Sequence, residues 1–69
     1  MLNVEIGSVW RHLKTGHIYI VVGECLIEAS VTDAILYRRC DGTRGPVWCR
    51  PLSEFTDGRF VLKEIEDDR

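Results

Sequence analysis

Three short segments of this chain each place an aromatic ring beside an arginine: Trp10-Arg11-His12-Leu13-Lys14, Tyr37-Arg38 and Val47-Trp48-Cys49-Arg50-Pro51-Leu52. A ring provides a flat face for stacking, and a guanidinium provides a planar fork of donors for a carboxylate or a phosphate. Small β-barrels that bind nucleic acids combine such rings with basic grooves. We therefore expect a surface that binds a planar or anionic partner. The candidate ligand-binding residues are Arg11, His12, Lys14, Tyr37, Arg38, Trp48 and Arg50.

The first segment also has a purely structural interpretation. Side chains alternate along a strand, so Arg11 should face away from Trp10 and His12. In the structural interpretation Trp10 packs in the core, Arg11 lies on the surface, and His12 hydrogen-bonds a backbone carbonyl. In the functional interpretation His12 and a nearby arginine line a pocket at the rim that binds an anion.

The last segment leaves the same two interpretations open. Trp48 and Arg50 lie two residues apart, so they should share one face of a strand. Either they form an exposed recognition pair, or Trp48 anchors the core and Arg50 pairs with Glu54 or Asp41.

The loop before this segment affects the arginines on both sides of it. If the loop is symmetric about Arg44-Gly45, Arg39 should lie opposite Arg50, and two like charges that face each other are destabilising. An acid or a bound anion between them would relieve the repulsion.

The three cysteines, Cys25, Cys40 and Cys49, are an odd number at wide spacing without a Cys-x-x-Cys motif. We expect buried free thiols, and a disulfide between Cys40 and Cys49 across the glycine-rich turn is the alternative. A zinc site would need a further ligand from His12 or His17, and the spacing matches no zinc module. The sequence therefore predicts neither a metal nor a cofactor.

Catalysis is the less favoured class of function. A histidine with Asp33 or Asp41 could act as an acid and base, and Cys25 or Cys49 could act as a nucleophile. No Ser-His-Asp or Cys-His signature supports these combinations, and so short a chain has little room for an enclosed pocket. We predict that the protein is not an enzyme.

Glycine-containing turns divide the chain into five strand-like runs. Gly23 interrupts an apolar run in the way a bulge does, and Glu28 to Asp33 forms a polar connection. Residues 51–55 look like one helical turn, with Ser53 as its cap. The predicted strands are residues 7–14, 17–27, 34–40, 46–50 and 59–65. Together these elements predict an all-β fold, a small five-stranded SH3-like barrel with one short helical turn before the last strand.

A chain of 69 residues is one domain near the lower limit for folding alone. We expect a single barrel domain over residues 1–69, with its core at residues 7–65 and an acidic end at residues 64–69. The longest apolar run, residues 18–22, is too short to cross a membrane. The first residues lack the basic and apolar regions of a signal peptide, so we expect a cytoplasmic protein without membrane contact.

Charge is unevenly distributed along the chain. Residues 8–51 hold six Lys and Arg against four Asp and Glu, whereas residues 52–69 hold three against six. A net charge of −2 suits non-specific DNA binding poorly, but a local basic patch is compatible with it. The acidic end is expected to be a solvated terminus, or alternatively a tail that screens the basic face or contacts a partner.

The order of these motifs resembles DUF1653, a small family of bacterial and phage domains of unknown function. Members read roughly Tyr-Arg-His-Tyr-Lys-Gly, then Tyr-x-Val, Tyr-Arg, and Trp-Val-Arg-Pro-Leu-x-x-Phe. The resemblance covers about residues 7–65 and departs from the pattern at Trp10, Leu13, Thr15 and Cys49. It implies no activity. The matching residues here are Trp10-Arg11-His12-Leu13-Lys14, Gly16, Tyr19-x-Val21, Tyr37-Arg38, Val47-Trp48-Cys49-Arg50-Pro51-Leu52 and Phe55.

The sequence therefore predicts a small binding module that recognises nucleic acid or another anionic partner through an aromatic and arginine face. The alternative is a protein-interaction adaptor that holds a peptide or partner protein through a strand edge or an aromatic groove. Self-association is a further variant, because so small a chain gains stability from a partner.

Overall fold

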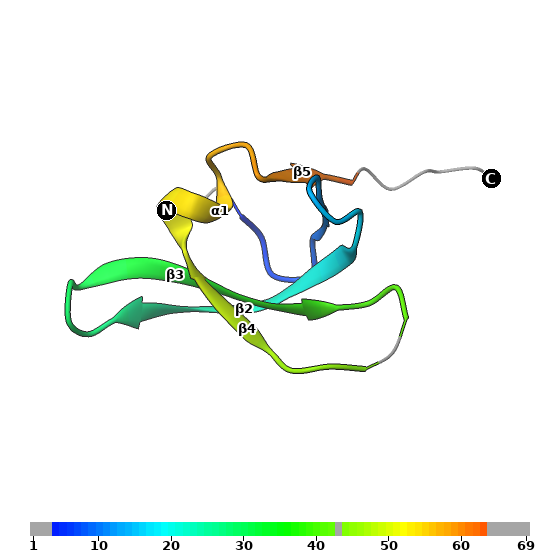
Figure 1. Ribbon diagram of the computed structural model, residues 1–69. Coiled ribbons are helices and arrows are strands. Elements are labelled where there is room, and N and C mark those ends of the chain that lie inside the picture. The colour runs from blue at the N-terminus through cyan, green and yellow to red at the C-terminus, as the bar shows by residue number, and fades with distance from the viewer. Residues whose placement is uncertain (1–3, 43, 64–69) are drawn as a thin grey trace.

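The computed structural model describes residues 4–42 and 44–63, which form five strands and one short helix (Figure 1). Each predicted element is present, because β-branched and aromatic residues fill the strands, and glycine turns or the polar connection after Ile27 separate them. The elements are β1 (Val9–His12), β2 (Ile18–Ile27), β3 (Thr32–Arg39), β4 (Trp48–Pro51), α1 (Leu52–Phe55) and β5 (Phe60–Leu62).

The strands form one antiparallel sheet in the order β4-β3-β2-β1-β5. Figure 1 shows α1 and β5 on the same side of the part made by β2, β3 and β4. We call the sheet face that carries Val21, Ile35 and Tyr37 the inner face, and the opposite one the outer face. The all-β prediction with a helical turn before the last strand is confirmed. The sheet is not closed into a barrel, since no pairing joins β4 to β5 in the described part of the chain.

Strand β2 bends at Gly23, as the sequence predicted. The register with β3 shifts between Val21 and Gly23, which is a β-bulge. A Cβ at position 23 would lie 3.4 Å from Leu36 Cδ1, so the glycine leaves the space that this side chain occupies. The bulge lets one long strand pair with β1 at one end and with the far end of β3 at the other.

The core on the inner face consists mainly of stacked aromatic rings. Phe55 of α1 and Phe60 of β5 stack with their centroids 4.3 Å apart and their planes 12° apart, and Phe55 is fully buried. Tyr37 meets both rings edge-on, at 5.3 Å and 5.5 Å. The ring of Trp10 packs on Phe55 at 5.1 Å. Edge-to-face and offset ring pairs stabilise a core beyond the area that they bury.

The helical turn α1 begins after Pro51, whose φ of −54° suits a helix start. No side chain caps its first turn, so the predicted cap at Ser53 is wrong. Pro51 occupies the cap position, and Ser53 is the second residue of the helix. At the other end the Thr56 hydroxyl donates to the Leu52 carbonyl at 2.9 Å.

The register between β3 and β4 differs from the symmetric hairpin expected from the sequence. Arg50 lies opposite Ile35, whereas Arg39 pairs with Tyr19 of β2. The prediction that Arg39 faces Arg50 is therefore wrong, because the pairing of Tyr37 with Trp48 is centred two residues earlier in the chain than Arg44-Gly45. Arg39 instead forms an ion pair with Asp41 at 2.9 Å.

The cysteine predictions have a mixed outcome. All three thiols are free, so the Cys40–Cys49 disulfide is not formed. All three residues are exposed, so the prediction of buried thiols is wrong. The reason is alternation: Cys25 and Cys49 point to the outer face, away from the aromatic core.

Strand β3 begins at Thr32, two residues before the predicted start. The acidic end at residues 64–69 and the end of the predicted fifth strand lie outside the described residues. In the part of the chain that is described, no helix is long and apolar enough to cross a membrane.

We expect Phe55→Ala to lower the free energy of unfolding by about 3–5 kcal/mol, since it removes the ring at the centre of the core. For so small a domain this is most of the stability. Val61→Ala, at a side chain that is 43% exposed, should cost less than about 1 kcal/mol. Urea unfolding followed by circular dichroism measures both. Equal losses in the two variants would contradict this description of the core.

Candidate anion-binding site

A hollow of about 480 Å³ lies at the end of β1 and is lined by His12, Leu13, Lys14, Arg50 and Arg59. We call it the basic hollow. Strand pairing brings its walls together: His12 lies opposite Phe60, and the Leu13 N–H donates to the Arg59 carbonyl at 3.0 Å. Four of its five residues carry a side chain that is positive or can become so.

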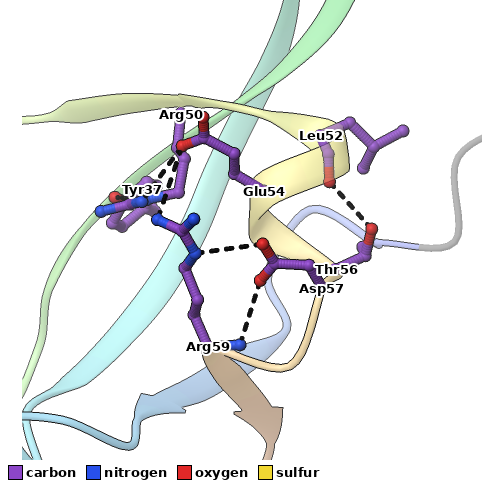
Figure 2. Close-up of polar contacts among 7 residues, drawn as sticks. All are labelled: Tyr37, Arg50, Leu52, Glu54, Thr56, Asp57 and Arg59. Atoms are coloured by element: carbon purple, nitrogen blue, oxygen red, sulfur yellow. Dashed lines mark hydrogen bonds and ion pairs between the residues drawn. The ribbon is translucent and has the colours of Figure 1, made fainter.

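Arg50 is held in a fixed position by three neighbours, two of which Figure 2 shows. Its Nε donates to the Tyr37 hydroxyl at 3.1 Å, and its Nη1 donates to Glu54 Oε1 at 3.3 Å. Its guanidinium carbon also lies 5.6 Å from the centre of the Phe60 ring, within the range of a cation–π contact. The bond to Tyr37 and the charge of Glu54 raise the pKa of Arg50 against the effect of burial. The guanidinium is therefore a permanent, oriented positive charge.

Arg59 comes from the turn before β5 and approaches the same acid (Figure 2). Its Nη1 lies 3.7 Å from Glu54 Oε1, and its Nε lies 3.1 Å from Asp57 Oδ2. The Arg59 backbone N–H also donates to Asp57, at 3.2 Å. Glu54 thus holds the two arginines side by side on one edge of the hollow.

His12 forms the opposite wall of the basic hollow. Its ring packs 4.8 Å from Phe60, and its Nδ1 lies 3.1 Å from the Thr15 hydroxyl. Desolvation and the nearby charges, with Arg50 first and Lys14 next among them, lower the pKa of His12 below its ordinary value of 6.5. The unfolded chain therefore binds a proton at His12 more readily than the folded protein does. Because of this, the contribution of His12 lowers the free energy of unfolding as the pH falls through 6.5.

The balance of charge around the hollow favours an anion. Lys14, Arg50 and Arg59 are positive, and Glu54 and Asp57 are the carboxylates that pair with the arginines. One net positive charge therefore remains when His12 is neutral, and two when it is protonated. Such a site can bind a phosphate or carboxylate group by charge-assisted hydrogen bonds.

The structure brings together part of the residue set expected from the sequence. His12, Lys14 and Arg50 share the basic hollow. Tyr37 is buried beneath it and orients Arg50. Trp48 lies opposite Tyr37 on the inner face and is 49% exposed, so it does not anchor the core.

Arg11 and Arg38 are not part of this group. Both are exposed on the outer face, because each follows a residue whose ring points inward. Arg38 lines a different hollow at the end of β3, together with Arg39 and Arg44. The seven candidate residues therefore divide between two faces of the sheet.

Arg59 is a site residue that sequence reasoning missed. Its neighbours Asp57 and Gly58 were interpreted as a simple turn before the last strand. The strand order expected for the predicted barrel could have identified it. If the last strand pairs with β1, the turn before the last strand lies close to His12. Among the residues that the structure describes, no group of three or more His, Cys, Asp or Glu side chains could hold a metal ion.

Residues 8–65 match the family described as Protein of unknown function (DUF1653). Because the match covers most of the chain, the protein belongs to this family, as the sequence motifs predicted. No curated protein and no solved structure matches the chain.

We expect the pKa of His12, followed by NMR titration of its ring resonances, to lie below 6.5. Arg50→Gln should raise it, because this substitution removes the largest of the nearby charges that lower it. Lys14→Gln should raise it by a smaller amount. Arg38→Gln is the matched control on the outer face and should leave it unchanged. A His12 pKa that does not respond to Arg50→Gln would contradict the geometry of the basic hollow.

Proposed function

We propose that this protein is a small, non-catalytic binding module that recognises single-stranded nucleic acid through the basic hollow and the exposed ring of Trp48. The basic hollow would hold a backbone phosphate. The observation that supports the proposal most directly is the fixed pair of Arg50 and Arg59 beside His12 and Lys14. An oriented guanidinium loses little freedom when it binds an anion, so its contribution to affinity is large.

Trp48 supplies the second part of the proposal. It lies two residues from Arg50 on the same face of β4 and is about half exposed. A base can stack on such a ring while its phosphate reaches the arginine. Stacking accepts any base, so we expect weak sequence preference.

The proposal includes an SH3-like barrel as the finer description of the fold. The strand order β4-β3-β2-β1-β5, with α1 between β4 and β5, fits that architecture with an open seam between the two edge strands. A cytoplasmic location belongs to the same proposal, since nucleic acid is the expected partner.

Fluorescence anisotropy with a labelled single-stranded oligonucleotide tests this function. Since the hollow carries one net positive charge and would hold one phosphate, the slope of log K against log salt should be about −0.7, the value that single strands give per phosphate contact. Lys14→Gln should reduce the magnitude of that slope by about 0.7. Trp48→Ala should weaken binding by about 1–3 kcal/mol, with little change in the slope.

Arg11→Gln is the matched control, because Arg11 is equally positive but lies exposed on the outer face. It should leave both affinity and slope nearly unchanged. Binding that is independent of salt, or that Arg11→Gln weakens as much as Lys14→Gln, would overturn the proposal.

A protein-interaction adaptor is the second candidate, and one observation favours it. Strand β4 lies at the edge of the sheet, with Trp48 exposed beside it. An extended peptide could add to such an edge as a further strand. Under this alternative, partner capture would be insensitive to nuclease and salt. Cys49→Pro on β4 would abolish partner capture if the Cys49 N–H faces the partner. Lys14→Gln would leave partner capture unchanged.

A further inference from the structure

A second hollow, of about 530 Å³, lies where the chain leaves β3 and turns back toward β4 (Figure 1). We call it the arginine hollow, and it shares no lining residue with the basic hollow. Three of its five lining residues carry a guanidinium group, the planar fork of donors that suits a phosphate. The lining residues are Arg38, Arg39, Cys40, Gly42 and Arg44.

Arg39 is held in place by a carboxylate. Its Nε donates to Asp41 Oδ1 at 2.9 Å, and Asp41 Oδ2 accepts the Ile18 N–H at 2.9 Å. The hydrogen bond from Arg39, followed by the one from Ile18, lowers the pKa of Asp41, so this carboxylate is ionised at neutral pH. A Cβ at Gly42 would lie 3.3 Å from Arg39 Nη2, so the glycine leaves room for the guanidinium. Asp41 therefore fixes Arg39 to the start of β2.

The arginine hollow carries more positive charge than the basic hollow. Asp41 is paired with Arg39. Within the described residues, neither Arg38 nor Arg44 takes part in an ion pair, and both are exposed. Two net positive charges therefore remain, against one in the basic hollow when His12 is neutral. A phosphodiester in a strand carries one negative charge, whereas a phosphate monoester carries close to two at pH 7. The charge of the arginine hollow thus fits a monoester.

The exposed ring of Trp48 lies between the two hollows. Trp48 is opposite Tyr37 on the inner face. Arg50, which lines the basic hollow, lies two residues after Trp48 on β4. Arg39, which lines the arginine hollow, lies two residues after Tyr37 on β3. Because β3 and β4 are antiparallel, the two arginines are diagonal neighbours of Trp48 on opposite sides of it. A base that stacks on this ring would have one neighbouring phosphate toward each hollow.

We propose that the arginine hollow binds the terminal phosphate of a nucleic-acid strand, so that the protein recognises a phosphorylated strand end. The inference rests on the proposed function, since it places the last base on Trp48 and the next phosphate in the basic hollow. The 5′ and the 3′ end of a strand can each carry a phosphate monoester, and the recognised chemistry is the same. The phosphate is held by charge-assisted hydrogen bonds from Arg38, Arg39 and Arg44.

Fluorescence anisotropy with one oligonucleotide, labelled at an internal base, tests this site. The forms compared have hydroxyl groups at both ends, a 5′ phosphate, a 3′ phosphate, or either phosphate as its methyl ester. We expect one of the two phosphorylated forms to bind at least tenfold more tightly than the hydroxyl form. Its methyl ester, which carries one negative charge instead of two, should lose most of that gain.

Two substitutions locate the gain in the arginine hollow. Arg38→Gln and Arg44→Gln should each reduce it to less than threefold, while affinity for the hydroxyl form stays within twofold of that of the unmodified chain. Arg11→Gln is the matched control, because Arg11 is exposed and positive on the outer face but lines neither hollow. It should preserve the full gain.

The hydroxyl form separates the two proposals. If it binds, but neither terminal phosphate adds affinity, this inference is overturned and the proposed function stands. A gain that survives both Arg38→Gln and Arg44→Gln would also overturn the inference. If no form of the strand binds, both proposals fail. A phosphoserine peptide that competes as well as the phosphorylated strand would assign the arginine hollow to a protein partner and overturn the strand-end proposal.

Discussion

The ring of Phe60 connects the core of this protein to its candidate site. One side of it stacks on Phe55 at 4.3 Å, which fixes α1 against β5. The same ring contacts His12 at 4.8 Å and lies 5.6 Å from the Arg50 guanidinium. The basic hollow therefore has an aromatic support rather than a flexible loop beneath it. A change that moves Phe60 would alter the core and the charge arrangement together.

Glu54 positions the two arginines of the basic hollow. It lies in the single turn α1 and contacts Arg50 of β4 and Arg59 of the turn before β5, and β4 and β5 are the opposite edges of the sheet. Exposed ion pairs of this kind contribute little to stability. Their effect here is on position: one carboxylate keeps two guanidinium groups side by side while leaving a net positive charge toward His12 and Lys14. Stability comes instead from the ring cluster, which is why so short a chain can hold an open sheet together.

Much of this arrangement could be predicted from local sequence. Alternation correctly placed Trp10 and His12 on one face and Arg11 on the other, and Gly23 marked the bulge. The same rule, applied to Tyr37 and Arg38, would have separated these two residues as well. The β3–β4 register was not predicted, because symmetry about Arg44-Gly45 puts Arg50 opposite Arg39, whereas Arg50 lies opposite Ile35. Arg59 was missed because its position depends on the pairing of β1 with β5, which are distant in sequence.

The most direct test of the account is NMR mapping of the isotope-labelled protein during titration with a single-stranded oligonucleotide. The account predicts the largest shift changes at His12, Lys14, Arg50, Arg59 and the indole N–H of Trp48. Changes confined to Arg11 and Arg38 on the outer face, or no changes at all, would contradict it.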